Sequence, residues 1–199
     1  MGTIIESIGI SSGHRGLFSP SALKLADEAI TSCLSHTQRT ADDLDVLINV
    51  GMYKEQSLGE PAFASMIQEE LGAHRGHPNI GGHGTLSFDV YNGACGMLSA
   101  VQLIDGLLSS GTASLGVVVA SDVDPDPGIS RGFAFPAAGG AILLGSDQAR
   151  PGFTGFHLAT FPEYADLFAS ELAWEEGARH SFPRRATGRN ILTVTISES

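Results

Sequence analysis

The stretch Phe88-Asp-Val-Tyr-Asn-Gly-Ala-Cys-Gly-Met97 places a cysteine between a short strand and a strongly apolar helical pattern. The helical pattern continues through Leu108 and ends at Ser109-Ser-Gly111. Partial positive charge at a helix N-terminus favours a thiolate over a thiol, so this position predicts that Cys95 is reactive. Spacing alone leaves open the alternative that Cys95 is an inert cysteine packed in the core.

Strands and helices alternate on both sides of this stretch. Ser19 is expected to cap a first helix with Pro20 at its first position, and Pro61 is expected to open a second helix that Gly72 ends. The strands are predicted at residues 3–10, 44–50, 86–90, 113–120 and within 134–144, followed by two more at 153–160 and 191–196. This order predicts a layered α/β fold with a mixed sheet.

Composition limits the function classes. With 199 residues, of which 42% are hydrophobic, the chain can bury the core of a single domain. The net charge of −11 excludes unaided nucleic-acid binding, because no basic cluster could neutralise a row of phosphates. No apolar run approaches the roughly 20 residues needed to span a membrane, and the N-terminus lacks the features of a secretory signal. A cytoplasmic protein with free thiols is therefore expected, and Cys33, on the apolar face of the first helix, is interpreted as core.

The stretch from Phe88 to Met97, which contains Cys95, resembles the nucleophile turn of the thiolase-like condensing enzymes, in particular the ketoacyl-ACP synthase III branch. The resemblance extends in matching order over nearly all of residues 1–196. The other segments that carry it are Asp43-Leu-Asp-Val-Leu-Ile48, Leu107-Leu-Ser-Ser-Gly111, Val117-Val-Val-Ala-Ser-Asp122 and Ala137-Ala-Gly-Gly-Ala-Ile-Leu-Leu144.

The resemblance implies that residues 1–199 form one domain, the N-terminal half of a thiolase-like enzyme. This half is a β-α-β-α-β-α-β-β layered unit with a mixed five-stranded sheet. Cys95 would accept an acyl group from coenzyme A or acyl-carrier protein and pass it to a carbon nucleophile in a Claisen condensation. The backbone N–H of Cys95 would help to form an oxyanion hole. Acyl-CoA or acyl-carrier protein enters as substrate, and no cofactor or metal is implied.

Family members contain a second copy of this unit, which supplies a His and an Asn, or paired His residues, that no residue here matches. We therefore expect a partner subunit that carries the His and Asn, forming a hetero-oligomer; a homodimer of half-units, which would lack the His, is the rival. The alternative from another class is a non-catalytic subunit that stabilises or regulates a condensing enzyme. Acyl transfer to oxygen or nitrogen is a third possibility, because it uses the same thiolate.

Glu60 is the second candidate catalytic residue. The stretch Tyr53-Lys-Glu-Gln-Ser-Leu-Gly-Glu-Pro61 resembles a loop of the olefin-biosynthesis acyl-CoA condensing enzymes, whose glutamate enters the neighbouring subunit's pocket as a base. The alternative is an ordinary carboxylate that stabilises a helix start. The segment that grips the CoA adenine in the family is missing, since only residues 11–19 separate the first strand from the first helix, and the donor carrier is left open.

Three further groups of residues could suggest a metal or binding site, but each has a simpler interpretation. The loop histidines His74, His77 and His83 are at spacings that could suggest a metal site, but solvated histidines are favoured because no cysteine or carboxylate lies among them. The aspartates of Asp122-Val-Asp-Pro-Asp126 begin like a calcium loop, but its Gly and distal Glu are out of register. The pair Arg184-Arg185 could meet an acidic carrier protein, although a solvated loop is favoured.

Overall fold

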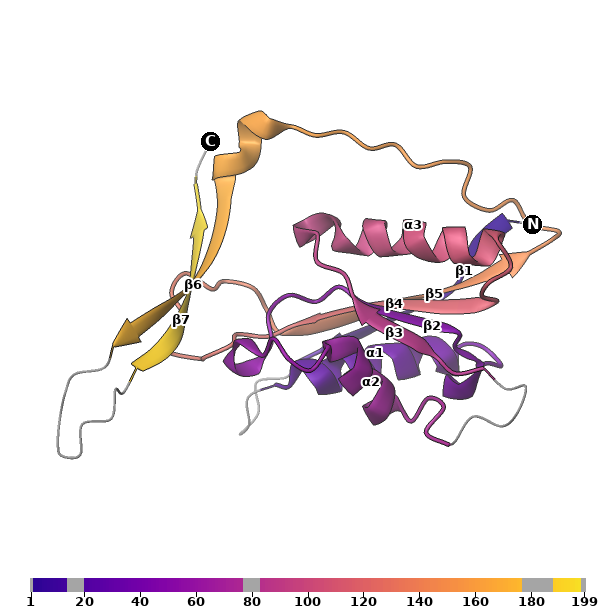
Figure 1. The fold of residues 1–199 in the computed structure, drawn as a ribbon, viewed down its shortest axis with the longest axis horizontal. Helices are drawn as coiled ribbons and strands as arrows, with labels where there is room; N and C mark the ends of the chain where they lie inside the picture. Colours follow the sequence, from indigo (N-terminus) through magenta and orange to yellow (C-terminus); the bar gives the residue numbers. More distant parts are fainter. Residues whose placement is uncertain (1, 14–19, 77–82, 177–187, 198–199) are drawn as a thin grey trace.

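A five-stranded mixed sheet forms the centre of the molecule (Figure 1). The computed structural model describes residues 2–13, 20–76, 83–176 and 188–197. The sheet has the order β1-β5-β4-β2-β3 and consists of β1 (Gly2–Ser12), β2 (Val46–Asn49), β3 (Leu86–Asp89), β4 (Leu115–Asp122) and β5 (Ala138–Asp147). β2, β3 and β4 are parallel, whereas β5 pairs antiparallel with both β4 and β1. The predicted α/β class and mixed sheet are confirmed.

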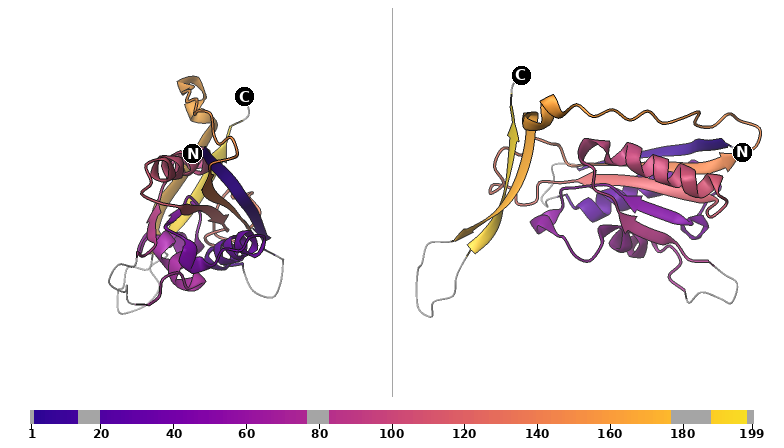
Figure 2. Two further views of the ribbon diagram at one scale, coloured as in Figure 1. Left: turned by 90° about the vertical axis from the view of Figure 1, so that its right-hand side faces the viewer. Right: turned by 45° about the horizontal axis from the view of Figure 1, so that its top comes forward.

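Helices cover both faces of the sheet (Figures 1 and 2). They are α1 (Ala22–Ser35) and α2 (Phe63–Leu71) on one face and α3 (Gly96–Ser109) on the other. Successive residues of β2 point to opposite faces of the sheet. Leu47 therefore belongs to the core that includes Ile30 of α1, and Ile48 belongs to a separate core that includes Ile104 of α3. All four residues of β2 are buried, as predicted for a parallel strand covered on both sides. Among the described residues, no helix is both long and apolar enough to cross a membrane.

The first helix begins later than predicted. Its N-cap is Ser21, whose Oγ accepts the N–H of Lys24 at 3.5 Å, and the first helical residue is Ala22. Pro20 therefore precedes the helix, and Ser19 lies outside the described residues. Ser21 takes the role because its hydroxyl is at the spacing from Lys24 that an N-cap requires.

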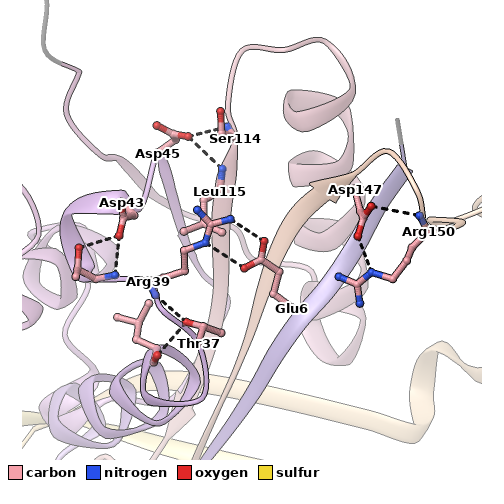
Figure 3. A network of polar contacts seen from close by, with 11 residues as sticks. Glu6, Thr37, Arg39, Asp43, Asp45, Ser114, Leu115, Asp147 and Arg150 are labelled. Carbon is pink, nitrogen blue, oxygen red and sulfur yellow. Dashed lines mark hydrogen bonds and ion pairs between the residues drawn. The ribbon is translucent and has the colours of Figure 1, made fainter.

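Polar side-chain contacts hold the sheet together at the amino ends of its parallel strands (Figure 3). Asp45, directly before β2, accepts the N–H groups of Ser114 at 2.6 Å and Leu115 at 3.1 Å, which joins the start of β2 to the start of β4. Arg39 forms two parallel hydrogen bonds with the carboxylate of Glu6, at 3.0 and 3.3 Å, which ties the chain after α1 to β1. These contacts lie at the end of the sheet opposite to the carboxyl ends of β2, β3 and β4.

A two-stranded antiparallel hairpin lies apart from the sheet (Figure 2). It consists of β6 (Phe168–Glu176) and β7 (Gly188–Ile196). Arg131, in the loop between β4 and β5, holds the hairpin: its N–H donates to the carbonyl of Leu192, and its carbonyl accepts the N–H of Val194, both at 2.8 Å. The guanidinium of Arg131 also pairs with Glu175 of β6 at 2.7 Å.

The strand predicted at residues 153–160 is wrong, whereas the one predicted at 191–196 is confirmed as part of β7. Residues 153–160 are exposed and form no strand, although the N–H of Phe153 donates to the carbonyl of Thr3 at 3.1 Å. Alternating apolar residues favour an extended chain, but a strand also needs a neighbouring strand to share its backbone hydrogen bonds. β7 pairs with residues 168–176 rather than with residues 153–160. The described chain also contains the 3-10 helices η1 (Ala41–Asp43), η2 (Glu55–Ser57), η3 (Gly93–Cys95) and η4 (Pro162–Leu167).

One face of the molecule exposes large apolar side chains. Leu98 and Leu103 of α3 are 68% and 46% exposed. A Cβ on Gly9 of β1 would collide with the α1 backbone, so its neighbours Ile8 and Ile10, which are 55% and 77% exposed, point to the face that α3 covers. We call Ile8, Ile10, Leu98 and Leu103 the α3 surface. Apolar surface gathered in this way is typical of an interaction site.

Candidate active site

The loops that follow the three parallel strands meet at one edge of the sheet. Parallel strands end at the same edge, and α/β folds bind ligands there. The loop after β2 contains Lys54 and Glu60, the turn after β3 contains Tyr91 and Cys95, and Asp122 ends β4. The residues of this edge define the candidate site.

Cys95 lies between β3 and α3, where the sequence predicts it. It is the N-cap residue of α3, and its side chain is exposed. Gly96, the first helical residue, packs closely against the loop after β2: a Cβ at this position would lie 3.2 Å from Cβ of Val50. Glycine thus allows the helix start to approach the sheet, and the exposed sulfur does not fit the alternative of a cysteine packed in the core.

The backbone around Cys95 differs from the expectation. The N–H of Cys95 donates to the carbonyl of Asn92 at 3.0 Å, and the N–H of Gly96 donates to the carbonyl of Gly93. The chain enters α3 through the 3-10 helix η3, and this turn uses both donors. In this conformation the N–H of Cys95 is therefore not free to form an oxyanion hole. The side chain of Asn92 also braces the turn, because its Nδ2 donates to Oγ of Ser99 at 2.8 Å.

The carboxylate of Asp89 in β3, rather than that of Glu60, accepts hydrogen bonds from the first N–H groups of α2. Its carboxylate accepts the N–H of Phe63 at 2.7 Å, the N–H of Ala64 at 2.9 Å and the side-chain amide of Asn49 at 2.9 Å. The prediction that α2 begins two residues earlier is wrong, because the acceptor for its first N–H groups comes from the neighbouring strand. Glu60 is thus not required for this structural role.

Glu60 lies in the loop between η2 and α2, before Pro61, and its side chain is exposed. It forms no hydrogen bond or ion pair within the part of the chain that the structure describes. The fold does not join Glu60 to Cys95 through any such contact. The carboxylate faces solvent, where a neighbouring molecule can reach it.

Lys54 is only 3% exposed, and no motif in the sequence marks it as a functional residue. Its ammonium donates to the hydroxyl of Tyr91 at 2.6 Å and lies 5.0 and 4.9 Å from the ring centroids of Phe63 and Tyr91. The Tyr91 hydroxyl in turn donates weakly to Asp89 at 3.5 Å. A buried ammonium is costly unless it is compensated, and aromatic faces compensate it only in part. The one available signal was the position of this lysine in a loop expected at the carboxyl edge of the sheet.

A pocket of about 290 Å³ lies between this edge and the hairpin. Tyr53, Lys54 and Tyr91 line it from the sheet side, and Leu172 and Leu192 line it from the hairpin side. The carboxyl edge of the sheet therefore has a concave surface beside the turn that carries Cys95.

Asp122 is held by the backbone. Its Oδ1 accepts the N–H groups of Met52 and Tyr53 at 2.7 and 2.6 Å. Burial raises the pKa of Asp122 above its usual value, and these two hydrogen bonds oppose the rise. Asp124 accepts the N–H of Asp126 at 3.1 Å in a local turn. The carboxylates of Asp122 and Asp124 thus serve the loop backbone.

The loop histidines His74 and His83 lie with their ring centroids 5.6 Å apart, and each contacts a different polar partner. His74 Nδ1 lies 2.9 Å from the hydroxyl of Thr85, and His83 Nδ1 lies 3.0 Å from the carboxylate of Asp45. Within the described ranges, no group of three or more His, Cys, Asp or Glu side chains is placed to hold a metal ion. His77 and the pair Arg184-Arg185 lie outside these ranges.

Comparison with known proteins points to one family, although no protein-family model matches the chain. β-Ketoacyl-[acyl-carrier-protein] synthase III of Methylococcus capsulatus is 24% identical over 98% of this chain and 59% of its own length. The crystal structure of 3-oxoacyl-(acyl carrier protein) synthase III from Pseudomonas aeruginosa matches 85% of this chain and 58% of that chain, with 16% identity and a TM-score of 0.65. The chain is related to ketoacyl-ACP synthase III.

A further solved structure has a similar fold. A variant of OleA from Xanthomonas campestris matches 73% of this chain and 56% of that chain, with 14% identity and a TM-score of 0.57. The chain spans about half the length of the curated relatives that it matches. The thiolase-like fold is confirmed, and the coverage fits the N-terminal half of a condensing enzyme.

Proposed function

We propose that this chain is the nucleophile-bearing half of a ketoacyl-synthase-III-like enzyme. The exposed sulfur of Cys95 at the start of α3, on the carboxyl edge of the sheet, carries the proposal. The Cys95 thiolate attacks the carbonyl carbon of an acyl thioester, and the bond from that carbon to the carrier sulfur breaks. The acyl group stays on Cys95 as a new thioester, and the carrier leaves as a thiol with the proton that Cys95 released.

A second half-unit on a partner chain completes the enzyme and supplies the His and Asn for Claisen condensation. The α3 surface supports this proposal, because Leu98 and Ile10 together with their neighbours leave an apolar face that a second unit would cover. The acyl carrier is coenzyme A or acyl-carrier protein. Residues 1–199 act as one domain in this complex.

Glu60 is proposed as the base that acts on the acceptor in a neighbouring subunit. Its exposure supports the proposal, and so does the capping of α2 by Asp89, which leaves the Glu60 carboxylate without that structural role. The second half-unit or another copy of the complex would receive this loop. A Glu60→Gln variant should still form the acyl-enzyme but lose turnover.

The test measures the intact mass of the protein after incubation with acetyl-CoA and octanoyl-CoA, alone and with any chain that co-purifies. We expect a mass increase equal to one acyl group, which Cys95→Ser abolishes and the matched variant Cys33→Ala retains. An unmodified protein, even with its partner present, would favour the non-catalytic subunit instead. Offering carbon, oxygen and nitrogen acceptors to the acyl-enzyme then distinguishes condensation from acyl transfer.

A further inference from the structure

Two histidine rings lie side by side at the amino end of the parallel strands. His74 follows α2, His83 precedes β3, and their ring centroids are 5.6 Å apart. His83 contacts Asp45, directly before β2, and His74 contacts Thr85, directly before β3. No carboxylate lies between these histidines in the sequence, but the fold brings Asp45 to them. This end of the sheet is opposite to the edge that carries Cys95, so the pair is separate from the candidate active site.

The hydrogen bonds of Thr85 determine which ring nitrogen of His74 carries the proton. The Thr85 hydroxyl donates its single hydrogen to the carbonyl of Leu44 at 2.7 Å. Its oxygen can therefore only accept from His74, and Nδ1 of His74, 2.9 Å away, is the donor. In the neutral ring the other nitrogen, Nε2, then has a lone pair, which is the form that binds a metal ion.

The carboxylate of Asp45 determines the proton position of His83 in the same way. A carboxylate only accepts hydrogen bonds, so Nδ1 of His83, 3.0 Å from Oδ1 of Asp45, is the donor. The second oxygen of Asp45 accepts the N–H groups of Ser114 and Leu115, which hold the carboxylate in place (Figure 3). Within the described ranges, the Nε2 atom of neither histidine forms a hydrogen bond or ion pair. Both lone pairs are therefore available to an ion.

The spacing of the two rings suits one shared ion. Two imidazoles bonded to a tetrahedral ion at the usual Zn–N distance of about 2.0–2.1 Å have ring centroids about 5 Å apart. The observed separation of 5.6 Å is close to this value. The backbone of His74 is also held, because Asp42 accepts its N–H at 2.7 Å in a turn where φ of His74 is 49°. The position of this ring therefore does not depend on the ion.

We propose that His74 and His83 bind one divalent transition-metal ion through their Nε2 atoms. Metal-binding histidines nearly always donate the other ring N–H to a carboxylate or another acceptor, and Asp45 and Thr85 are these acceptors here. Imidazole ligands select ions such as Zn²⁺ and Cu²⁺, whereas Ca²⁺ and Mg²⁺ prefer oxygen. The carboxylates of Asp42 and Asp45 add negative charge that attracts a cation.

The site is open and exchangeable. Two imidazoles leave two positions of a tetrahedral ion to water, whereas closed structural zinc sites have four protein ligands. The bound ion joins the chain after α2 to the chain before β3, which stabilises this end of the sheet. Binding is independent of the acylation proposed for Cys95.

Isothermal titration calorimetry with ZnCl₂ on the untagged chain tests the proposal. The exposed thiol of Cys95 can itself bind zinc, so every chain carries Cys95→Ser. We expect one Zn²⁺ per chain with a Kd below about 100 µM, and no displacement by an equal concentration of Ca²⁺. His83→Ala, at a side chain that is 69% exposed, should weaken zinc binding about tenfold or more, whereas the matched variant His157→Ala, at another exposed histidine, should bind like the parent.

Long-range ¹H–¹⁵N NMR spectra of the metal-free protein supply a second measurement. Both histidines should be in the Nδ1–H form, and added zinc should shift their Nε2 resonances. Three results would overturn the proposal: no zinc binding up to about 1 mM, undiminished binding by His83→Ala, or displacement by Ca²⁺, which would indicate the carboxylates alone. An Nε2–H form of His74 would do the same. His74→Ala should also lose binding, and if it does not fold, His83→Ala still decides.

Discussion

The carboxylate of Asp89 should contribute more to the stability of the fold than any other group at the carboxyl edge. Asp89→Ala leaves the N–H groups of Phe63 and Ala64 and the buried amide of Asn49 without their acceptor. A hydrogen bond to a charged group contributes about 1.5–3 kcal/mol, and loss of a helix cap costs about 1 kcal/mol. Because the three bonds share one carboxylate and water reaches part of the site, we expect a total loss of about 3 kcal/mol. Asp89→Asn, which keeps one acceptor oxygen, should lose about half of this.

Urea unfolding of the full chain at pH 7, followed by circular dichroism, measures this loss as a shift of the midpoint at constant slope. Glu60→Ala is the matched control, since Glu60 is exposed two residues before the N-cap of α2 and makes no hydrogen bond or ion pair in the described chain. It should change the free energy of unfolding by no more than about 0.5 kcal/mol. If Glu60→Ala costs as much as Asp89→Ala, the assignment of the cap to Asp89 is wrong.

Two further predictions concern the thiols and the pH dependence of stability. Iodoacetamide should label Cys95 alone in the native protein and both cysteines in urea, with the number of labels counted by intact mass. The reason is that Cys33 is fully buried, donates to the carbonyl of Ala141 at 3.2 Å and has a pKa that burial raises. Rapid labelling of both cysteines in the native protein would contradict this prediction. Burial also raises the pKa of Asp122 above its ordinary 3.8, so the unfolded chain releases its proton first and the free energy of unfolding falls as the pH rises from about 4 through the raised pKa. Asp122→Asn should remove that decline in urea titrations across this range, and an unchanged pH profile would refute the burial of this carboxylate.

The elements flanking Cys95 could be predicted because their signals are local. The apolar run of β2, the helical spacing of α3 and the glycines beside Cys95 each depend on neighbours in the chain, and the structure has a strand, a helix and a tight helix start at these places. The predicted first residues of α1 and α2, near Ser19 and Pro61, were wrong for opposite reasons. α1 took a cap two residues later in its own sequence, and α2 took its cap from another strand. The strand at 153–160 was wrong because extended residues become a strand only when a partner pairs with them.

The order of the residues by itself determined the alternation of strands and helices, the two-sided burial of β2 and the position of Cys95 between β3 and α3. Only the tertiary structure decided that Asp89 caps α2 and that Lys54 is buried against Tyr91. It also decided that the β6–β7 hairpin lies across a pocket from Lys54 and Tyr91. Periodicity and capping act over a few residues, so a sequence displays them directly. The contacts of Asp89 and Lys54 join residues 25 or more positions apart, and they exist only because parallel pairing brings the ends of separate strands to one edge.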